Sequence, residues 1–188
     1  MLPKDDAGST ALKRSPAALE EQPKKRSRFA EATPTVPKAV MVLTLTILYL
    51  FAGAERHCDF GSHMRRLCSE RGIMVVLEEI DLLRKGEQHD VTKDEVWKPL
   101  LAKVASNVYD AVIATPPCNT HSRAPWSNRN GPRPIRDFHF PNGFPWLEGW
   151  QLQKAEPANM LVDKTLEVLE LAAGQPKNPA CLMEHPET

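Results

Sequence analysis

The residue best suited to covalent chemistry is a cysteine just beyond an apolar segment. Cys118 follows the run YDAVIA (109–114) and the pair Pro116-Pro117. Two prolines remove two backbone donors and restrict the chain, which fixes the direction in which the thiol is presented. A thiolate is a strong nucleophile, and cations such as Arg123 favour that form of a thiol. The alternative interpretation is a partly buried structural cysteine after a strand.

The other cysteines indicate no metal site and no disulfide framework. Cys58, Cys68 and Cys181 lie far apart from one another and from Cys118, and no CxxC pair occurs. With no secretory signal peptide, this spacing favours reduced thiols in an intracellular protein. We interpret these three as core or incidental thiols.

Charged side chains gather at two further kinds of position. Carboxylates follow two apolar runs: Glu78, Glu79 and Asp81 come after IMVVL, and Glu184 follows ACLM. The long segment 119–156 instead interleaves cations with six aromatic side chains, and its arginines are Arg123, Arg129, Arg133 and Arg136. Cations can neutralise phosphates and aromatic rings can stack on bases, so this segment is a candidate nucleic-acid surface. The alternative is a folded hydrophobic lid over the sheet edge.

These residues sit between segments that alternate in type. The apolar patterns predict strands near 43–51, 73–77, 109–114 and 179–183, separated by helices near 63–71, 92–105 and 157–173. Ser62 is the expected cap of the first helix, and the capping box Thr92-Lys93-Asp94-Glu95 is expected to open the second. Pro99 is expected to kink or shorten that second helix.

The alternation predicts the fold class. Each strand is followed by a crossover long enough to return in parallel, which favours an α/β fold, Rossmann-like, with an open, mostly parallel sheet and helices on both faces. In such sheets ligands bind at the carboxyl ends of the strands. Those ends carry the sequences FAGAE, EEID, TPPC and EHPE. The candidate chemistry and the expected ligand edge therefore coincide.

The N-terminal part of the chain has a different composition. Residues 1–40 contain eight Lys/Arg and five Asp/Glu, many prolines and no apolar period, which predicts a disordered basic tail before a domain at 41–188. The cluster 24–28 (KKRSR) is either a nuclear-import or phosphate-binding signal or a solvated charge run. The uncharged segment 39–54 is shorter than the roughly 20 residues of a membrane span, and it is interpreted as a buried strand. We therefore expect no membrane association, and a membrane anchor at 39–54 is the less favoured alternative.

Three short motifs carry a family resemblance. The series Phe51-Ala52-Gly53, Pro116-Pro117-Cys118 and Glu184-His185-Pro186 resembles the motifs of the carbon-5 cytosine DNA methyltransferases, in the same order. The stretch 131–150 (GPRPIRDFHFPNGFPWLEGW) resembles more closely a divergent methyltransferase-like group associated with mobile elements. The resemblance covers residues of about 45–187.

The resemblance implies a cofactor and roles for particular residues. It implies a methyltransferase fold that binds S-adenosylmethionine, with Cys118 as the nucleophile and Glu184 as the acid. The cofactor would lie against Phe51, Ala52, Gly53 and Pro116. A carboxylate after the second strand would accept hydrogen bonds from the ribose, and Glu78 and Glu79 are preferred to Asp81 by position.

Asp90 stands where the family contacts the adenine amino group, although a solvent-exposed turn aspartate is the alternative. DNA is the expected partner, more than RNA. The expected localisation is intracellular, with the nucleus as one alternative.

The resemblance also implies further strands beyond Thr188. We therefore expect a sheet that is incomplete at its C-terminus: a fragment, a degenerate copy, or a domain completed by a partner chain. The alternative function is an inactive or truncated domain that acts at most as a nucleic-acid-binding module.

Overall fold

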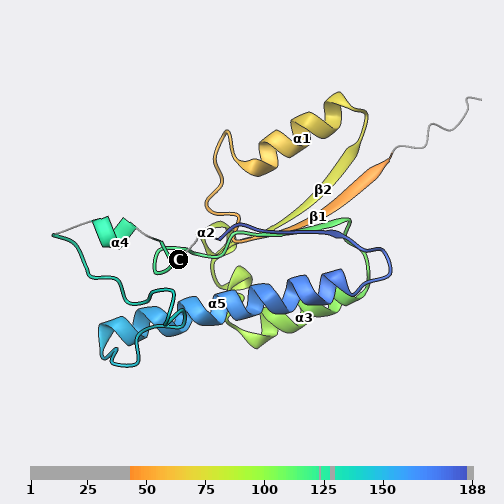
Figure 1. Cartoon of the computed structure of the whole chain (residues 1–188). Helices are drawn as coiled ribbons and strands as arrows, with labels where there is room; N and C mark the ends of the chain where they lie inside the picture. The colour runs from red at the N-terminus through yellow and green to blue at the C-terminus, as the bar shows by residue number, and fades with distance from the viewer. Residues whose placement is uncertain (1–42, 123, 128–129, 186–188) are drawn as a thin grey trace, which may run out of the picture. The chain divides into compact units, whose positions relative to one another are not determined.

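The computed structural model describes residues 43–122, 124–127 and 130–185 (Figure 1). The expected tail with its basic cluster lies outside these residues, as do Arg123 and Arg129. The elements in chain order are β1 (Thr44–Leu50), α1 (Phe60–Glu70), β2 (Met74–Ile80), α2 (Leu82–Lys85), the 3-10 helix η1 (Gly86–His89), α3 (Asp94–Ala105), β3 (Ala111–Ala114), α4 (Ala124–Ser127), α5 (Trp150–Ala173) and β4 (Ala180–Met183).

The strands form a single all-parallel sheet. Their order is β2-β1-β3-β4. Figure 1 shows α1 on one face of this sheet and α3 with α5 on the other. The predicted α/β class with a parallel sheet is confirmed, and the arrangement is consistent in general terms with a Rossmann-like fold. Because β2 and β3 lie on opposite sides of β1, the strand order reverses there, which is where such sheets bind ligands.

The main core lies between the sheet and the helices α3 and α5. Leu48 and Leu50 of β1 alternate along the strand and are fully buried on this face, as are Val112 and Ala114 of β3. They pack against apolar side chains of the two helices, namely Trp97, Leu100, Val104, Val168 and Ala172. Trp97 also donates from Nε1 to Glu167 Oε2 at 2.8 Å, which ties α3 to α5.

The segment 39–54, which was weighed as a membrane anchor, contains a strand within its described residues. Thr44–Leu50 is β1, paired on both sides within the sheet. Among the described residues, no helix has the length and apolar character needed to cross a bilayer.

Helix α1 begins earlier than the sequence predicts. Asp59 caps it, since its side chain accepts from the Ser62 backbone N–H at 2.9 Å, whereas Ser62 itself was expected to be the cap. Phe60 packs edge-on against Tyr49 of β1 with ring centroids 4.9 Å apart. This contact anchors the first turn to the sheet and explains the earlier start.

The expected capping box at α3 does not form. Lys93 is the N-cap residue, and the Thr92 hydroxyl donates to Asp90 Oδ1 at 2.6 Å instead. Helix α3 continues through Pro99 to Ala105, so the proline does not shorten the helix. Burial of Trp97, Leu100 and Val104 on both sides of Pro99 stabilises the helix across it.

The loop predicted at 119–156 is shorter than expected. It contains the single helical turn α4 and ends at Gly149. Helix α5 begins at the next residue, Trp150, which is seven residues before the predicted start at 157. Ile135, Leu147 and Ala155 form a small buried cluster, with Phe144 packed against it. This cluster binds the first turns of α5 to the loop, so the helix is stabilised there by packing that a local sequence pattern does not show.

Candidate functional site

The turn after β1 has strained backbone at the expected ligand edge. Phe51 has a φ of 61° and Gly53 a φ of 72°. A left-handed φ is readily adopted by glycine but is an outlier for a bulky residue such as phenylalanine. The neighbouring strand ends hold Phe51 in place: its N–H donates to Ile80 O at 2.7 Å, and the Thr115 hydroxyl donates to its carbonyl at 2.8 Å. Strain held by surrounding structure is typical of binding sites.

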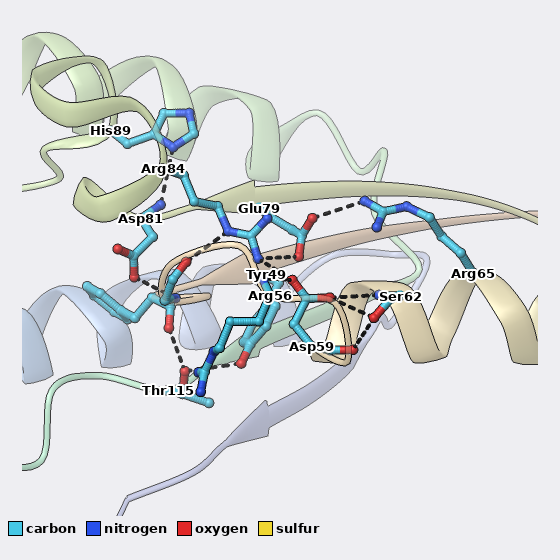
Figure 2. Close-up of polar contacts among 12 residues, drawn as sticks. Tyr49, Arg56, Asp59, Ser62, Arg65, Glu79, Asp81, Arg84, His89 and Thr115 are labelled. Carbon is cyan, nitrogen blue, oxygen red and sulfur yellow. Dashed lines mark hydrogen bonds and ion pairs between the residues drawn. The ribbon is translucent and has the colours of Figure 1, made fainter.

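Asp81 joins this turn to the end of β2. Its Oδ2 accepts from the Gly53 N–H at 2.8 Å (Figure 2). Its Oδ1 accepts from the Leu83 N–H at 2.7 Å. The backbone N–H of Asp81 donates to His89 Nδ1 at 3.2 Å. Because Nδ1 is an acceptor here, His89 is a neutral imidazole with its proton on Nε2. Burial lowers the pKa of His89, in agreement with that form.

A cavity of about 280 Å³ opens at the carboxyl ends of β1, β2 and β3. Its walls are largely apolar and include two carboxylates, Asp81 and Asp90. The lining residues are Phe51, Ile80, Asp81, Leu82, Leu83, His89, Asp90, Val91, Thr92, Pro117 and Leu161. The strained turn, the end of β2 and the Pro-Pro segment therefore face one space.

Asp90 is oriented by the residue two positions later. Both the N–H and the hydroxyl of Thr92 donate to Asp90 Oδ1, at 3.1 and 2.6 Å. The hydroxyl hydrogen bond is the main reason that the pKa of Asp90 is lowered, so the side chain is ionised at neutral pH. Oδ2 has no hydrogen-bond partner within the described part of the chain, which leaves an acceptor at the cavity.

Glu78 and Glu79 lie elsewhere, because β2 is longer than predicted. The strand extends to Ile80 and so includes both glutamates, whose side chains point to opposite faces. Glu78 pairs with Lys103 and accepts from Tyr109 OH at 2.6 Å. Burial opposes ionisation of Glu78, but these two hydrogen bonds lower its pKa overall. Neither glutamate lines the 280 Å³ cavity, whereas Asp81, the least favoured of the three by sequence, does.

Glu79 belongs to a charged network that closes the turn from the other side. Arg84 donates from Nε to the Gly53 carbonyl at 2.9 Å, and its Nη2 lies 2.9 Å from Asp59 Oδ2 and 3.0 Å from Glu79 Oε1. Figure 2 shows these side chains directed toward one another, with Arg65 adding a 3.0 Å contact to Glu79. A backbone hydrogen bond from Ser62 holds the pKa of Asp59 well below its usual range. Sequence patterns did not identify Arg84, since its partners come from three segments.

Cys118 directly follows a residue of the cavity wall. Pro116 is buried, Pro117 lines the 280 Å³ cavity, and Cys118 is exposed. The Cys118 carbonyl accepts from the N–H groups of His121 and Ser122 at 3.0 and 2.9 Å, so a tight turn follows the thiol directly. The prolines and this turn present an exposed thiol beside the cavity.

Glu184 lies just after the neighbouring strand. Its N–H donates to Ala114 O at 3.0 Å, which extends the β3–β4 pairing by one step, and its side chain is exposed. The next residue, His185, packs edge-on against His121 with ring centroids 4.4 Å apart. The structure thus joins the turn after Cys118 to the residue that follows Glu184.

The two described loop arginines have different environments. Arg133 is exposed, whereas Arg136 is only 3% exposed and donates from Nη1 to Asn159 Oδ1 and Pro141 O at 2.7 Å each. The sequence predicted that Arg136 would neutralise phosphates on the surface. Because the side chain is buried, that prediction is wrong. No local pattern in the sequence indicates this burial, because the partner Asn159 belongs to α5.

No family model, curated protein or solved structure matches the chain. Within the described ranges, no group of three or more His, Cys, Asp or Glu side chains is placed to hold a metal ion.

Proposed function

We propose that this domain is a methyltransferase-like domain that binds S-adenosylmethionine in the 280 Å³ cavity. The observation that carries the proposal is the pair Asp81 and Asp90 on the wall of an apolar cavity at the carboxyl ends of three parallel strands. Carboxylates at these positions accept hydrogen bonds from the hydroxyl and amino groups of a nucleoside.

The dimensions and donors of the cavity suit the nucleoside part of the cofactor. Its volume is near the lower limit of small-molecule sites, which is about 300 Å³. Asp81 stands at the end of β2, where a ribose would be bound, and the unpartnered Oδ2 of Asp90 can accept from an adenine amino group. Phe51, Val91 and Leu161 supply apolar walls for a purine ring.

The thiol beside the cavity indicates the reaction. When bound, S-adenosylmethionine supplies an electrophilic methyl group. Cys118 would add as a thiolate to carbon 6 of a cytosine, which makes carbon 5 nucleophilic. Carbon 5 would take this methyl group, with S-adenosylhomocysteine as the leaving group. Loss of the carbon-5 proton to a base and departure of the thiolate from carbon 6 would then restore the aromatic ring. Glu184, at the end of the neighbouring strand, would hold a proton at ring nitrogen 3 during the addition.

Transfer of a labelled methyl group tests this function. The full chain is incubated with S-adenosylmethionine labelled in its methyl group and with a cytosine-containing oligonucleotide. We expect label at carbon 5 of cytosine with the wild type and none with Cys118→Ser. Cys58→Ala, which changes another exposed thiol, is expected to keep the activity. Transfer by Cys118→Ser at the wild-type rate would refute the proposed nucleophile.

A further inference from the structure

Strand β2 forms one edge of the sheet. Within the described residues it pairs only with β1. The backbone groups of successive residues in a strand point to its two sides in turn. The Met74 N–H donates to Leu43 O at 2.9 Å, so Met74 and every second residue after it face β1. The N–H and C=O groups of Val75, Leu77 and Glu79 therefore point outward, and none has a hydrogen-bond partner in the part of the chain that the structure describes.

Apolar side chains are exposed along this edge strand. Met74 and Val76 are 53% and 49% exposed. They lie on the same face of the sheet as Ile80, which is the face that α3 covers, because alternate residues of a strand share a face. Sheets that keep a free edge commonly protect it with lysine or proline, and β2 contains neither. The strand therefore has the features of an edge that pairs with another strand.

A cavity of about 320 Å³ lies beside the C-terminal half of β2. Its apolar lining comes from the strand and from α3, namely Ile80, Val96, Pro99 and Leu100. Glu78 also lines it, and the Glu78 carboxylate is already paired with Lys103. One end of β2 thus offers an apolar cavity, and the other end offers the exposed side chains of Met74 and Val76.

A second copy of the chain brings these two ends together. Leu77 is the middle residue of β2. When two β2 strands pair antiparallel about a two-fold axis at Leu77, Met74 of each copy lies opposite Ile80 of the other. Met74 then lies next to the cavity, and the contact occurs twice because the interface is the same patch on both copies.

The same register suits the charges and the backbone groups. Val76 lies opposite Glu78 and Val75 opposite Glu79, so no glutamate faces another glutamate across the pair. The two Leu77 residues form a hydrogen-bonded pair, as do Val75 and Glu79, and every outward N–H and C=O group gains a partner. A strand from another protein could form these hydrogen bonds. The match between the exposed end of β2 and its own cavity favours a second copy.

We propose that two copies of this chain associate through the outer edge of β2 and form one continuous sheet. Met74 of each copy packs into the cavity between β2 and α3 of the other. This inference is independent of the proposed methyl transfer, because it rests on the strand edge and on a cavity that the transfer does not use.

The molar mass in solution tests the association. Size-exclusion chromatography with light scattering on the full chain is expected to give twice the 21.1 kDa of one chain, falling toward one chain on dilution. A mass of one chain at every concentration would overturn the proposal, and the edge of β2 would then be open to a strand from another protein.

Three variants locate the interface. Val76→Glu places a carboxylate opposite Glu78 of the partner at two symmetric positions and is expected to weaken association roughly tenfold or more. Met74→Ala shortens the side chain that enters the cavity and is expected to weaken it roughly fivefold or more. Both side chains are exposed in the single chain, and circular dichroism checks that the variants fold. Leu182→Glu makes the matched change on the other edge strand, β4, and is expected to associate as the wild type does.

Amide hydrogen exchange identifies the paired backbone. We expect the N–H groups of Leu77 and Glu79 to exchange roughly tenfold or more slowly in the wild type than in Val76→Glu at the same concentration. The N–H of Glu78, which faces β1, is the internal control and is expected to be protected in both proteins.

The remaining outcomes also decide the matter. Association at wild-type strength in folded Val76→Glu and Met74→Ala, or its loss in Leu182→Glu, would place the interface elsewhere and overturn the proposal. Unprotected Leu77 and Glu79 amides in a protein with the mass of two chains would do the same. Cofactor binding is measured separately, so failure of either proposal leaves the other standing.

Discussion

Cys118 and His121 are three residues apart in the chain but differ in solvent exposure. The Cys118 thiol is exposed, whereas the His121 ring is buried against Arg136 and His185. The sequence identified Cys118 because a thiol after Pro-Pro is a local signal. It did not identify His121, because the partners that define its role lie 15 and 64 residues away along the chain. Residues with local signals were predictable, and those defined by distant partners were not.

Replacing Cys118 with alanine separates chemistry from stability. The thiol is exposed, so we expect the free energy of unfolding to change by less than about 0.5 kcal/mol. We also expect loss of the covalent adduct that the wild type forms, with S-adenosylmethionine present, on an oligonucleotide containing 5-fluorocytosine. The adduct persists because fluorine cannot leave carbon 5 as a proton does. Denaturing electrophoresis detects it, and adduct formation by Cys118→Ala would contradict the assignment.

His121 is expected to make stability depend on pH. The pKa falls from an ordinary value of 6.5 to about 4 in the folded chain, so the unfolded chain binds the proton first as pH decreases. Stability is therefore lost as the pH falls from about 6.5 toward 4, and at pH 5.5 the loss is roughly 1 kcal/mol. Urea titrations across this range measure it.

The matched variants attribute that loss to one side chain. His121→Gln is expected to show a shallower decrease of unfolding free energy on acidification, while His63→Gln follows the wild type. An identical pH dependence in His121→Gln and the wild type would show that His121 titrates normally in the folded protein.

Among the elements, the placement of α1 against β2 depends on a glycine. A Cβ on Gly61 would lie 2.6 Å from Glu79 Oε1 and 3.0 Å from Leu77 Cδ2. Glu79 cannot move aside freely because Arg65 and Arg84 both hold its carboxylate. The close packing of α1 against β2 at Gly61 keeps Glu79 in the charged network with Arg84, and this network also holds the turn after β1.

Gly61→Ala is expected to lower the free energy of unfolding by about 1–3 kcal/mol through overpacking. Gly174→Ala is the control, because its Cβ would meet only carbonyl oxygens at 3.5 and 3.7 Å and its φ is −78°. We expect that variant to be unchanged or stabilised by up to about 1 kcal/mol. Chemical denaturation compares them, and equal stabilities would mean that α1 can shift away from β2 without cost.

Arg84 joins α2, the β1–α1 turn and β2, and its loss is expected to loosen all three. Arg84→Met leaves the buried carboxylates of Asp59 and Glu79 without this cation, which we expect to cost about 3 kcal/mol. Arg66→Met removes an exposed pair with Glu70 and is expected to cost less than about 0.5 kcal/mol. Thermal unfolding followed by circular dichroism makes the comparison. Similar melting temperatures for the two variants would show that the Arg84 network does not hold the turn.

Element boundaries show where sequence reasoning ends. The strand and helix order was predicted because apolar periods and crossover lengths are local properties. The extension of β2 through Glu78 and Glu79 was not predicted, because two consecutive carboxylates indicate the end of a strand. In the structure Lys103 pairs with Glu78 and Arg84 with Glu79. The early start of α5 likewise depends on Ala155 packing against Ile135 and Leu147.

For the molecule as a whole, the strand order accounts for the position of the site. The reversal at β1 brings the ends of β1, β2 and β3 to one edge, and Phe51, Asp81 and Pro117 meet there at a cavity. The sequence predicted this edge and, among the residues that line the cavity, named Phe51, Asp90 and the less favoured candidate Asp81. The sequence preferred Glu78 and Glu79 to Asp81, but of these three only Asp81 lines the cavity. The preference failed because β2 extends to Ile80 and includes both glutamates.

Calorimetric titration of S-adenosylmethionine into the full chain tests the central claim most directly. We predict heat from one site per chain and a loss of affinity of about tenfold or more in Asp90→Ala, since Oδ2 of Asp90 is the acceptor proposed for the adenine amino group. Asp94→Ala, which removes an exposed carboxylate paired with Lys98 at the start of α3, is predicted to bind like the wild type. Absence of binding heat at any cofactor concentration, or unchanged affinity in a folded Asp90→Ala, would contradict the account.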